Sequence, residues 1–198
     1  MCTVTFVPLP GHENGFILTS NRDEAVVRKT FPPEIYVEEG VQFLYPRDQE
    51  AGGTWIGLSE RRRSICLLNG GFTKHVRTPP YRKSRGVVVK ELLAVPNILK
   101  SISEYDFSGI EPFTALIVDF ARELEFRELV WEGSRYHLRK LPLEPGIWAS
   151  ALLYSEQEIA LRKKKFETFQ AKHSLTSENL LQFHSYGGST SEEGLIID

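Results

Sequence analysis

The residue with the clearest chemical potential is Cys2, which directly follows the initiator methionine of this 198-residue chain. A small side chain after the initiator favours removal of Met1, which would leave Cys2 with both a thiol and a free α-amino group. The α-amine titrates near ~7.7 to 8.0 and a free thiol near ~8.5, so the amine can accept the thiol proton at neutral pH. Cys2 is therefore predicted to act as nucleophile and base together.

Such a nucleophile needs a group that holds the thiolate, a carboxylate that orients the ammonium group, and donors for a tetrahedral oxyanion. Arg22, Asp23 and Asn69 are the candidates for these three roles. Adjacent side chains on a regular strand face opposite ways, so Arg22 and Asp23 can both reach Cys2 only if the chain turns there. Two alternatives stay open: the run 21–24 could be only a structural turn, and Asn69 with Gly70 could form a type I′ hairpin turn.

The N-terminal half must supply the strands that position these residues. Period-two alternation predicts a hairpin of strands over 2–7 and 16–20. Residues 25–53 contain several Pro and Gly, and only 43–45 resembles a strand, so we expect a long irregular segment that covers the site. A second strand pair is expected over 54–58 and 64–68, where Cys66 is predicted to be a buried core thiol.

In the C-terminal half, two helices are expected first, then a group of strands, then two more helices. Ser84 is predicted to cap a helix that ends before Pro96, and a short helix follows through 98–105. The runs 113–120, 124–131 and 136–141 are typical of an antiparallel meander, and another strand is expected over 147–154. Ser155 and Glu158 match a capping box, which predicts a helix to about residue 172, followed by a last helix near 177–184. This order predicts an α+β domain with antiparallel sheets.

The composition limits the kinds of partner that this chain is expected to bind. With 24 Lys+Arg against 26 Asp+Glu, the net charge of −2 argues against nucleic acid as the main partner, and the basic runs 61–63 and 162–165 are expected at the solvated surface. The five His and two Cys show no metal-ligand spacing, so neither a metal nor another cofactor is predicted. No apolar run reaches the ~20 residues of a membrane span. We expect a cytoplasmic protein that binds a small-molecule ligand or amide substrate and can form a homo-oligomer.

Several short motifs together resemble the NRDE family, which includes the transport and Golgi organisation proteins. The matching stretches are Met1 with Cys2, the run 21–24, the run 51–55, and Asn69 followed by Gly70, with weaker matches at 84–86 and at 183–188. They cover most of the chain in the right order. The resemblance implies an N-terminal nucleophile hydrolase-like αββα sandwich of two antiparallel sheets between helical layers. It implies one domain over residues 1–198, expected to be shortened at its C-terminus relative to the family.

The same resemblance extends remotely to cysteine amidases and implies a hydrolase of a small non-peptide amide. Cys2, Arg22, Asp23 and Asn69 would be catalytic, and Asn21 and Gly70 would contact the substrate. The amidases carry their arginine and aspartate three positions apart, whereas here the two are adjacent. This chain also reads Trp-Ala-Ser-Ala over 148–151, where the family often has a serine and an asparagine after a glycine. The alternative is a non-catalytic carrier of haem or another hydrophobic ligand, which retention of Met1 would favour.

Overall fold

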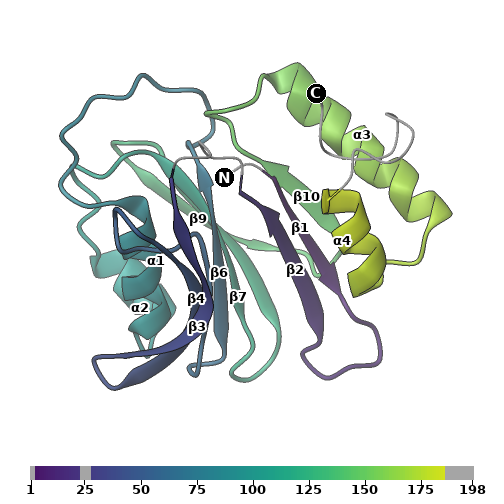
Figure 1. Cartoon of the computed structure of the whole chain (residues 1–198), viewed down its shortest axis with the longest axis horizontal. Helices are drawn as coiled ribbons and strands as arrows, with labels where there is room; N and C mark the ends of the chain where they lie inside the picture. The colour runs from purple at the N-terminus through teal and green to yellow at the C-terminus, as the bar shows by residue number, and fades with distance from the viewer. Residues whose placement is uncertain (1–2, 23–27, 186–198) are drawn as a thin grey trace.

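Two antiparallel sheets stacked face to face between two pairs of helices form the architecture (Figure 1). The computed structural model describes residues 3–22 and 28–185, so Cys2 and Asp23 lie outside the described residues. The helices are α1 (Arg85–Ala94), α2 (Ile98–Glu104), α3 (Glu156–Lys172) and α4 (Ser177–Ser185). The strands are β1 (Thr3–Pro8), β2 (Phe16–Asn21), β3 (Thr30–Glu38), β4 (Val41–Asp48), β5 (Ile56–Ser59), β6 (Arg63–Asn69), β7 (Phe113–Asp119), β8 (Glu125–Trp131), β9 (Tyr136–Leu141) and β10 (Gly146–Ala149).

The sheets differ in size. The smaller has the strand order β10-β1-β2, and the larger runs β3-β4-β5-β6-β7-β8-β9. In Figure 1, α1 and α2 flank the large sheet, and α3 and α4 flank the small one. The predicted αββα sandwich is confirmed, together with the meander and the capping box of Ser155 and Glu158.

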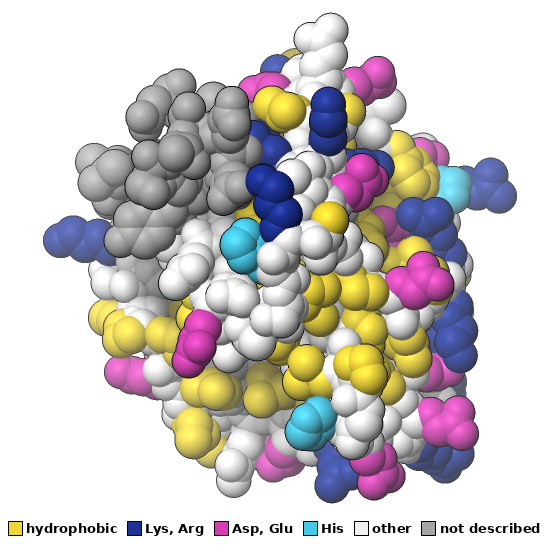
Figure 2. Space-filling view, turned by 90° about the vertical axis from the view of Figure 1, so that its right-hand side faces the viewer, with side chains coloured by type: hydrophobic (Ala, Val, Ile, Leu, Met, Phe, Trp, Pro, Cys, Tyr) yellow, Lys and Arg dark blue, Asp and Glu magenta, His cyan; other side chains and the backbone are white. Residues whose placement is uncertain are grey.

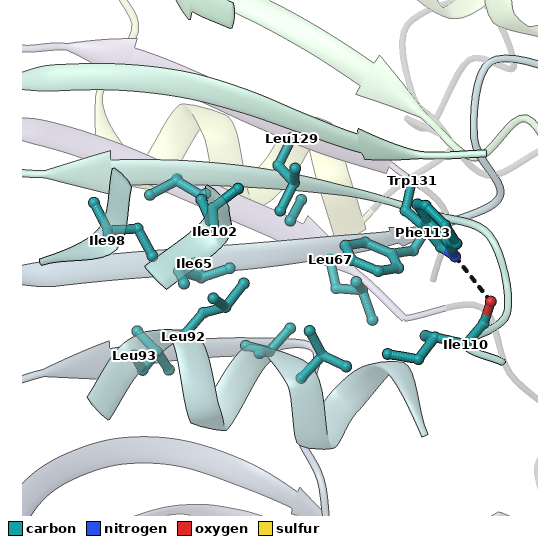
Figure 3. Packing of buried hydrophobic residues seen from close by; sticks show 14 of the residues in the cluster. Ile65, Leu67, Leu92, Leu93, Ile98, Ile102, Ile110, Phe113, Leu129 and Trp131 are labelled. Atoms are coloured by element: carbon teal, nitrogen blue, oxygen red, sulfur yellow. Dashed lines mark hydrogen bonds between the residues drawn. The ribbon is translucent and has the colours of Figure 1, made fainter. Parts of the chain in front are cut away.

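Three apolar clusters join the four layers. Under α1, Leu92 and Leu93 pack with Ile65 and Leu67 of β6 (Figure 3). Between the sheets, Val4 and Phe6 of β1 pack against residues of β6, β7 and β8. The third cluster lies between the small sheet and α3 with α4. Burial of apolar area on both faces of the large sheet therefore fixes the order of the layers.

Cys66 belongs to the cluster between the sheets and is fully buried, as predicted. Loss of solvation raises the pKa of its thiol to about 12. The Cys66 thiol is therefore protonated at neutral pH and is a packing group rather than a nucleophile.

The prediction of an irregular segment over 25–53 is wrong, because β3 and β4 form an edge hairpin there. Pro32 and Pro33 are among the residues that led us to expect an irregular segment there. Both lie on the edge strand, where the register shifts between Phe31 and Glu34, so their missing N–H groups remove no ladder hydrogen bond. The strand expected over 147–154 is also shorter, since β10 ends at Ala149.

Charges of both signs are interspersed with apolar side chains on the face seen in Figure 2, which is the right-hand side of Figure 1. Leu161 of α3 and Leu181 of α4 are among the exposed apolar residues. None of the helices in the described ranges is long and apolar enough to cross a membrane.

The expectation that the run 61–63 is solvated is wrong for Arg63. Its side chain is buried, and Nη1 donates hydrogen bonds to the carbonyls of Leu92 (3.1 Å) and Val95 (2.7 Å). Its Nε and Nη2 donate to Asp119 Oδ2 at 3.1 and 3.0 Å. Arg63 therefore ties the start of β6 to the C-terminal end of α1. Arg162 is likewise buried, and its guanidinium lies 3.5 Å from the ring centroid of Tyr154.

Replacing Arg63 should destabilise the fold. Arg63→Ala leaves Asp119 and two carbonyls without this partner, and we expect the free energy of unfolding to fall by about 3 kcal/mol. Arg61→Ala, an exposed arginine of the same turn, should change it by no more than about 0.5 kcal/mol. Urea unfolding of both variants measures the difference, and equal stability of the two would contradict the role given to Arg63.

Candidate functional site

A cavity of about 270 Å³ lies where the ends of β2 and β6 meet the first turn of α1. Strand ends and the loops that continue them supply Arg22, Arg28, Asp48, Trp55 and Asn69. The loop before α1 and its first turn supply Arg77, Tyr81, Lys83, Ser84 and Arg85. Arg22 and Asn69, which the sequence analysis selected, thus line the same cavity although 46 residues separate them in the chain.

Arg22 is held by a carboxylate from the other sheet. Its Nη2 lies 3.1 Å from Asp48 Oδ2, and Arg28 Nε reaches the same oxygen at 2.8 Å. The guanidinium of Arg22 also lies 4.8 Å from the ring centroid of Trp55. This combination of ion pair and cation–π contact fixes the guanidinium of Arg22 at the cavity wall.

Asp48 is ionised in this setting. Burial acts to raise the pKa of Asp48, but hydrogen bonds from the Ala51 amide and from Arg28 outweigh it and hold that pKa below its ordinary value. The Ala51 amide donates to Oδ1 at 2.8 Å. Asp48 therefore keeps a negative charge that its two arginines share.

Asn69 is the last residue of β6, paired with Phe113. Its carbonyl accepts a hydrogen bond from the Ser150 hydroxyl at 2.7 Å, and this contact attaches the end of β10 to the end of β6. Asn69 lines the cavity, and no other described residue hydrogen-bonds its side-chain amide. The amide is therefore available to donate to a ligand.

The type I′ alternative for Asn69 and Gly70 is wrong. That turn needs positive φ at both central residues, and here only Gly70 has one, at +88°. A Cβ at Gly70 would lie 2.8 Å from the backbone nitrogen of Leu152, so close packing requires glycine there. Gly70, expected at the substrate, is not among the described residues that line the cavity.

Asn21 also serves a structural contact. Its Nδ2 donates to the His184 carbonyl at 2.8 Å, and its Oδ1 contacts Nδ1 of the same histidine. His184 Nε2 lies 2.8 Å from the Thr5 hydroxyl. Asn21 thus connects β2 to α4 and, in the part of the chain described, does not line the cavity.

The sequence analysis missed the charged residues on the loop side of the cavity. Glu111 is buried. Its carboxylate oxygens lie 3.1 Å from Arg77 Nε, 3.4 Å from Arg85 Nη2 and 3.3 Å from His75 Nε2. A signal was present, because residues 77–85 include three arginines and a lysine. The acidic partners could not be identified from the sequence, since Glu111 lies 26 residues beyond Arg85.

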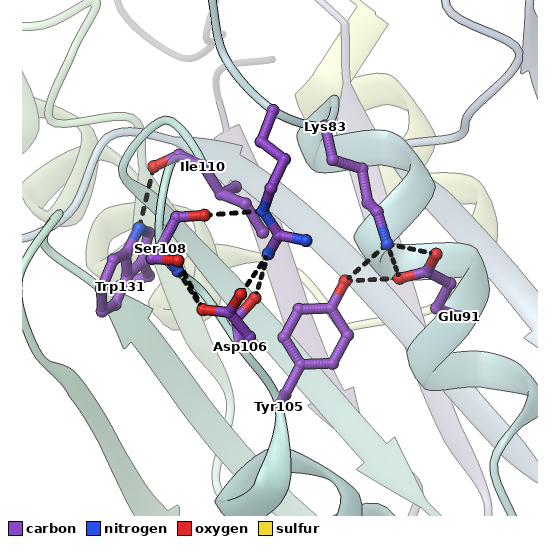
Figure 4. Close-up of polar contacts among 8 residues, drawn as sticks. Lys83, Glu91, Tyr105, Asp106, Ser108, Ile110 and Trp131 are labelled. Atoms are coloured by element: carbon purple, nitrogen blue, oxygen red, sulfur yellow. Dashed lines mark hydrogen bonds and ion pairs between the residues drawn. The ribbon is translucent and has the colours of Figure 1, made fainter.

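The same loop is anchored to the helices. Lys83 Nζ lies 2.6 and 2.8 Å from the two carboxylate oxygens of Glu91 on α1, and the Tyr105 hydroxyl also bonds to Glu91 (Figure 4). Desolvation together with this contact raises the pKa of Tyr105. The loop that carries the cavity's cations is therefore fixed to α1 and to the end of α2.

The arrangement can stabilise developing negative charge. Arg22 and Asn69, which carry a guanidinium and an amide, line one small cavity, and donors of these kinds suit an oxyanion. Within the described ranges, no group of three or more His, Cys, Asp or Glu residues is placed to hold a metal ion.

Comparisons with known proteins agree on the fold. The family model described as Transport and Golgi organisation 2 matches residues 1–185. No curated protein matches the chain in sequence. Among solved structures, the chain is similar to a Caenorhabditis elegans ortholog of N-acylethanolamine-hydrolyzing acid amidase, with a TM-score of 0.65 and 9% identity, covering 97% of this chain and 89% of that one.

Two variants of conjugated bile acid hydrolase from Clostridium perfringens give TM-scores of 0.50 and 0.51 at 9% identity, over 82% and 83% of this chain. This chain spans 57% of each of those structures. These neighbours are N-terminal nucleophile hydrolases, and at this identity the likeness shows the fold alone.

The Asp48 ion pairs should make stability depend on pH. A folded-state pKa below the unfolded value of about 3.9 adds stability that is complete above that value and is lost as the pH falls through the folded pKa. We expect Asp48→Asn to lower the free energy of unfolding by about 2 kcal/mol at neutral pH, and less as the pH falls below about 4. Chemical denaturation across pH measures this.

Glu60→Gln, at an exposed turn, is the matched control and should show neither effect. A pH-independent difference between Asp48→Asn and the unmodified chain would contradict the assignment of that stability to the ionised carboxylate.

Proposed function

Because the chain belongs to the Transport and Golgi organisation 2 family and has the N-terminal nucleophile hydrolase fold, we propose that it is a cysteine hydrolase of a small non-peptide amide. The observation that carries the proposal is that Arg22 and Asn69, whose side-chain amide bonds to no other described residue, line one cavity. One neighbour in fold is named an acid amidase and another a bile acid hydrolase.

The start of β1 supports Cys2 as the nucleophile. Thr3 pairs with Asn21, the residue before Arg22, and also with Ala149, the residue before Ser150. Covalent geometry keeps the Cα of Cys2 about 3.8 Å from that of Thr3. Cys2 therefore directly precedes a strand whose first residue, Thr3, pairs with the neighbour of Arg22, and Arg22 lines the cavity.

The reaction proceeds through an acyl-enzyme. After removal of Met1, the Cys2 sulfur attacks the amide carbon, and its proton passes to the α-amino group of the same residue. Asn69 donates a hydrogen bond to the oxyanion, Arg22 holds the thiolate, and Asp23 orients the ammonium. The C–N bond then breaks as the ammonium protonates the leaving nitrogen. Water attacks the resulting thioester and gives one proton to the α-amine. The C–S bond then breaks, the ammonium returns that proton to the sulfur, and the carboxylic acid leaves with the free thiol and amine regenerated.

A cytoplasmic location, an assembly of identical chains and a single domain over 1–198, all expected from the sequence, remain part of this proposal. The carrier alternative makes the opposite prediction about the N-terminus, because a chain that keeps Met1 has no free α-amine at Cys2.

The N-terminus provides the first test. The intact mass of the purified protein should lack one methionine residue, and Cys2→Ala should abolish hydrolysis while leaving the melting temperature nearly unchanged. Cys66→Ala, which changes the buried thiol instead, should retain activity per folded molecule. A fully active Cys2→Ala protein would eliminate the mechanism, and a retained Met1 would favour the carrier.

The oxyanion role of Asn69 gives a second test. Asn69→Ala removes a donor that bonds to no other described residue, so kcat should fall by about 100-fold to 1000-fold while stability changes little. Asn97→Ala is a matched control: Asn97 caps α2, so its loss should lower stability by about 1 kcal/mol without lowering kcat. An unchanged kcat in Asn69→Ala would remove Asn69 from the reaction.

A further inference from the structure

Exposed apolar side chains gather on one face of the large sheet, close to its β3 edge. Ile35 and Val37 of β3 are 71% and 67% exposed, and Leu44 of β4 and Leu58 of β5 are exposed as well. Ile35 lies opposite Leu44, and Leu44 lies opposite Leu58. Residues directly opposite each other on antiparallel strands project to the same face, and so do residues two apart on one strand. These four side chains therefore form one surface, the β3–β5 patch.

The β3–β5 patch continues the face of the large sheet on which the small sheet packs. Leu58 lies opposite Ser64, which is two residues from Cys66, and Cys66 belongs to the cluster between the sheets. In the part of the chain that the structure describes, the buried members of that cluster come from β1, β6, β7 and β8, and neither β3 nor β4 contributes to it. The apolar face thus extends beyond the sheet that covers it.

The small sheet ends with β2 over β6. Ser20 of β2 hydrogen-bonds with the Cys66 thiol of β6, whereas the Trp148 ring of β10 lies against the Phe126 ring of β8 with centroids 5.2 Å apart. The strands β5, β4 and β3 therefore project past β2. Since β2 and β3 are each the last strand of their sheets, the projecting face borders two open strand edges.

These features define the partner that would cover the β3–β5 patch. Stacked sheets lie about 10 Å apart, so the partner must be a sheet with an apolar face, three strands wide, whose outer strand can lie beside β2. The projecting part of a second copy meets each requirement. A two-fold axis at β4 would stack patch on patch and place β3 of each copy beside β2 of the other.

We propose that a second copy of this chain covers the β3–β5 patch and forms a two-fold symmetric dimer in which the two patches stack face to face. Such a contact uses the same surface on both copies, which is the usual form of a homodimer interface. Burial of apolar area drives it. The inference gives a surface to the assembly of identical chains that forms part of the proposed function, and it does not depend on hydrolysis.

The size of the projecting face sets the expected affinity. The strands β3, β4 and β5 have 9, 8 and 4 residues. At about 3.3 Å per residue and about 4.8 Å between strands, they present roughly 300 Å² of flat sheet per copy, before the relief of the side chains and the two strand edges are added. A standard stable interface buries about 800 Å² per partner, so we expect a weak dimer with a dissociation constant in the micromolar range.

Analytical ultracentrifugation over a range of protein concentrations tests the proposal. The mass of the unmodified chain should rise from 22.6 kDa toward twice that value as the concentration increases. Leu44→Lys should raise the dissociation constant at least about tenfold, because the two-fold axis brings two like charges together inside an apolar contact. Its melting temperature, measured where the unmodified chain is monomeric, should not change, since this leucine is exposed in a single copy.

Leu181→Lys is the matched control. This leucine is also exposed, at 56% against 44% for Leu44, but it belongs to α4 rather than to the β3–β5 patch. The dissociation constant should therefore stay the same.

A mixture of two variants tests the position of the axis. Leu44→Glu alone should weaken the dimer as Leu44→Lys does. An equimolar mixture of the two should associate more tightly than either variant alone, because each lysine then faces a glutamate across the axis.

Three results would overturn the proposal: a chain that stays monomeric at every concentration, a Leu44→Lys chain as dimeric as the unmodified one, or an equal loss of dimer in Leu181→Lys. A lower melting temperature of monomeric Leu44→Lys would also overturn it, since the chain itself would then cover the patch. A mixture that recovers no dimer would overturn the placement of the axis at β4. Dimerisation through this face without hydrolysis would contradict the proposed function alone, and hydrolysis by a monomeric chain would contradict the dimer alone.

Discussion

The packing of β1 against the large sheet is the contact on which the rest of the structure depends, because in the described chain the two sheets share no strand. The Phe6 and Phe126 rings stack with centroids 4.0 Å apart, and Val4 is fully buried beside them. Residues that line the cavity come from both sides of this interface. Arg22 follows a strand of the small sheet, and Asn69 ends a strand of the large one. A core that let the sheets slide would separate the groups that the chemistry needs together.

Near the cavity the contact between the sheets changes from apolar to polar. Ser150, which follows β10 of the small sheet, donates its hydroxyl to the Asn69 carbonyl of the large sheet at 2.7 Å. Arg22, which follows β2, reaches Asp48 of β4 at 3.1 Å. Such contacts add less free energy than the apolar core, since each replaces hydrogen bonds to water, but they are directional. The core therefore sets the distance between the sheets, and these two contacts set the positions of the groups at its edge.

The features that could be predicted from the sequence are those that depend on interactions between residues close together in the chain. Local signals were reliable: period-two alternation located β1 and β2, and Ser155 with Glu158 marked the start of α3. The hairpin of β3 and β4 was missed, because proline on an edge strand looks the same in sequence as proline in a loop. The acidic partners were missed for a different reason. Asp48 lies 26 residues from Arg22, and an ion pair at that separation exists only once the sheets have packed.

The fold gives one physical reason for the glycines in the motifs around residues 51–55 and 84–86. A Cβ on Gly53 would lie 2.5 Å from the carbonyl carbon of Gly86, and the Thr54 amide donates to the Gly86 carbonyl at 3.2 Å. Two backbones in contact leave no room for side chains, so the segment before β5 and the first turn of α1 must both be glycine at this point. That approach brings the start of α1 and the loop before it, with its cations, to the wall that carries Arg22 and Trp55. The motifs around residues 51–55 and 84–86 are therefore needed to build the cavity, whether or not either glycine touches a substrate.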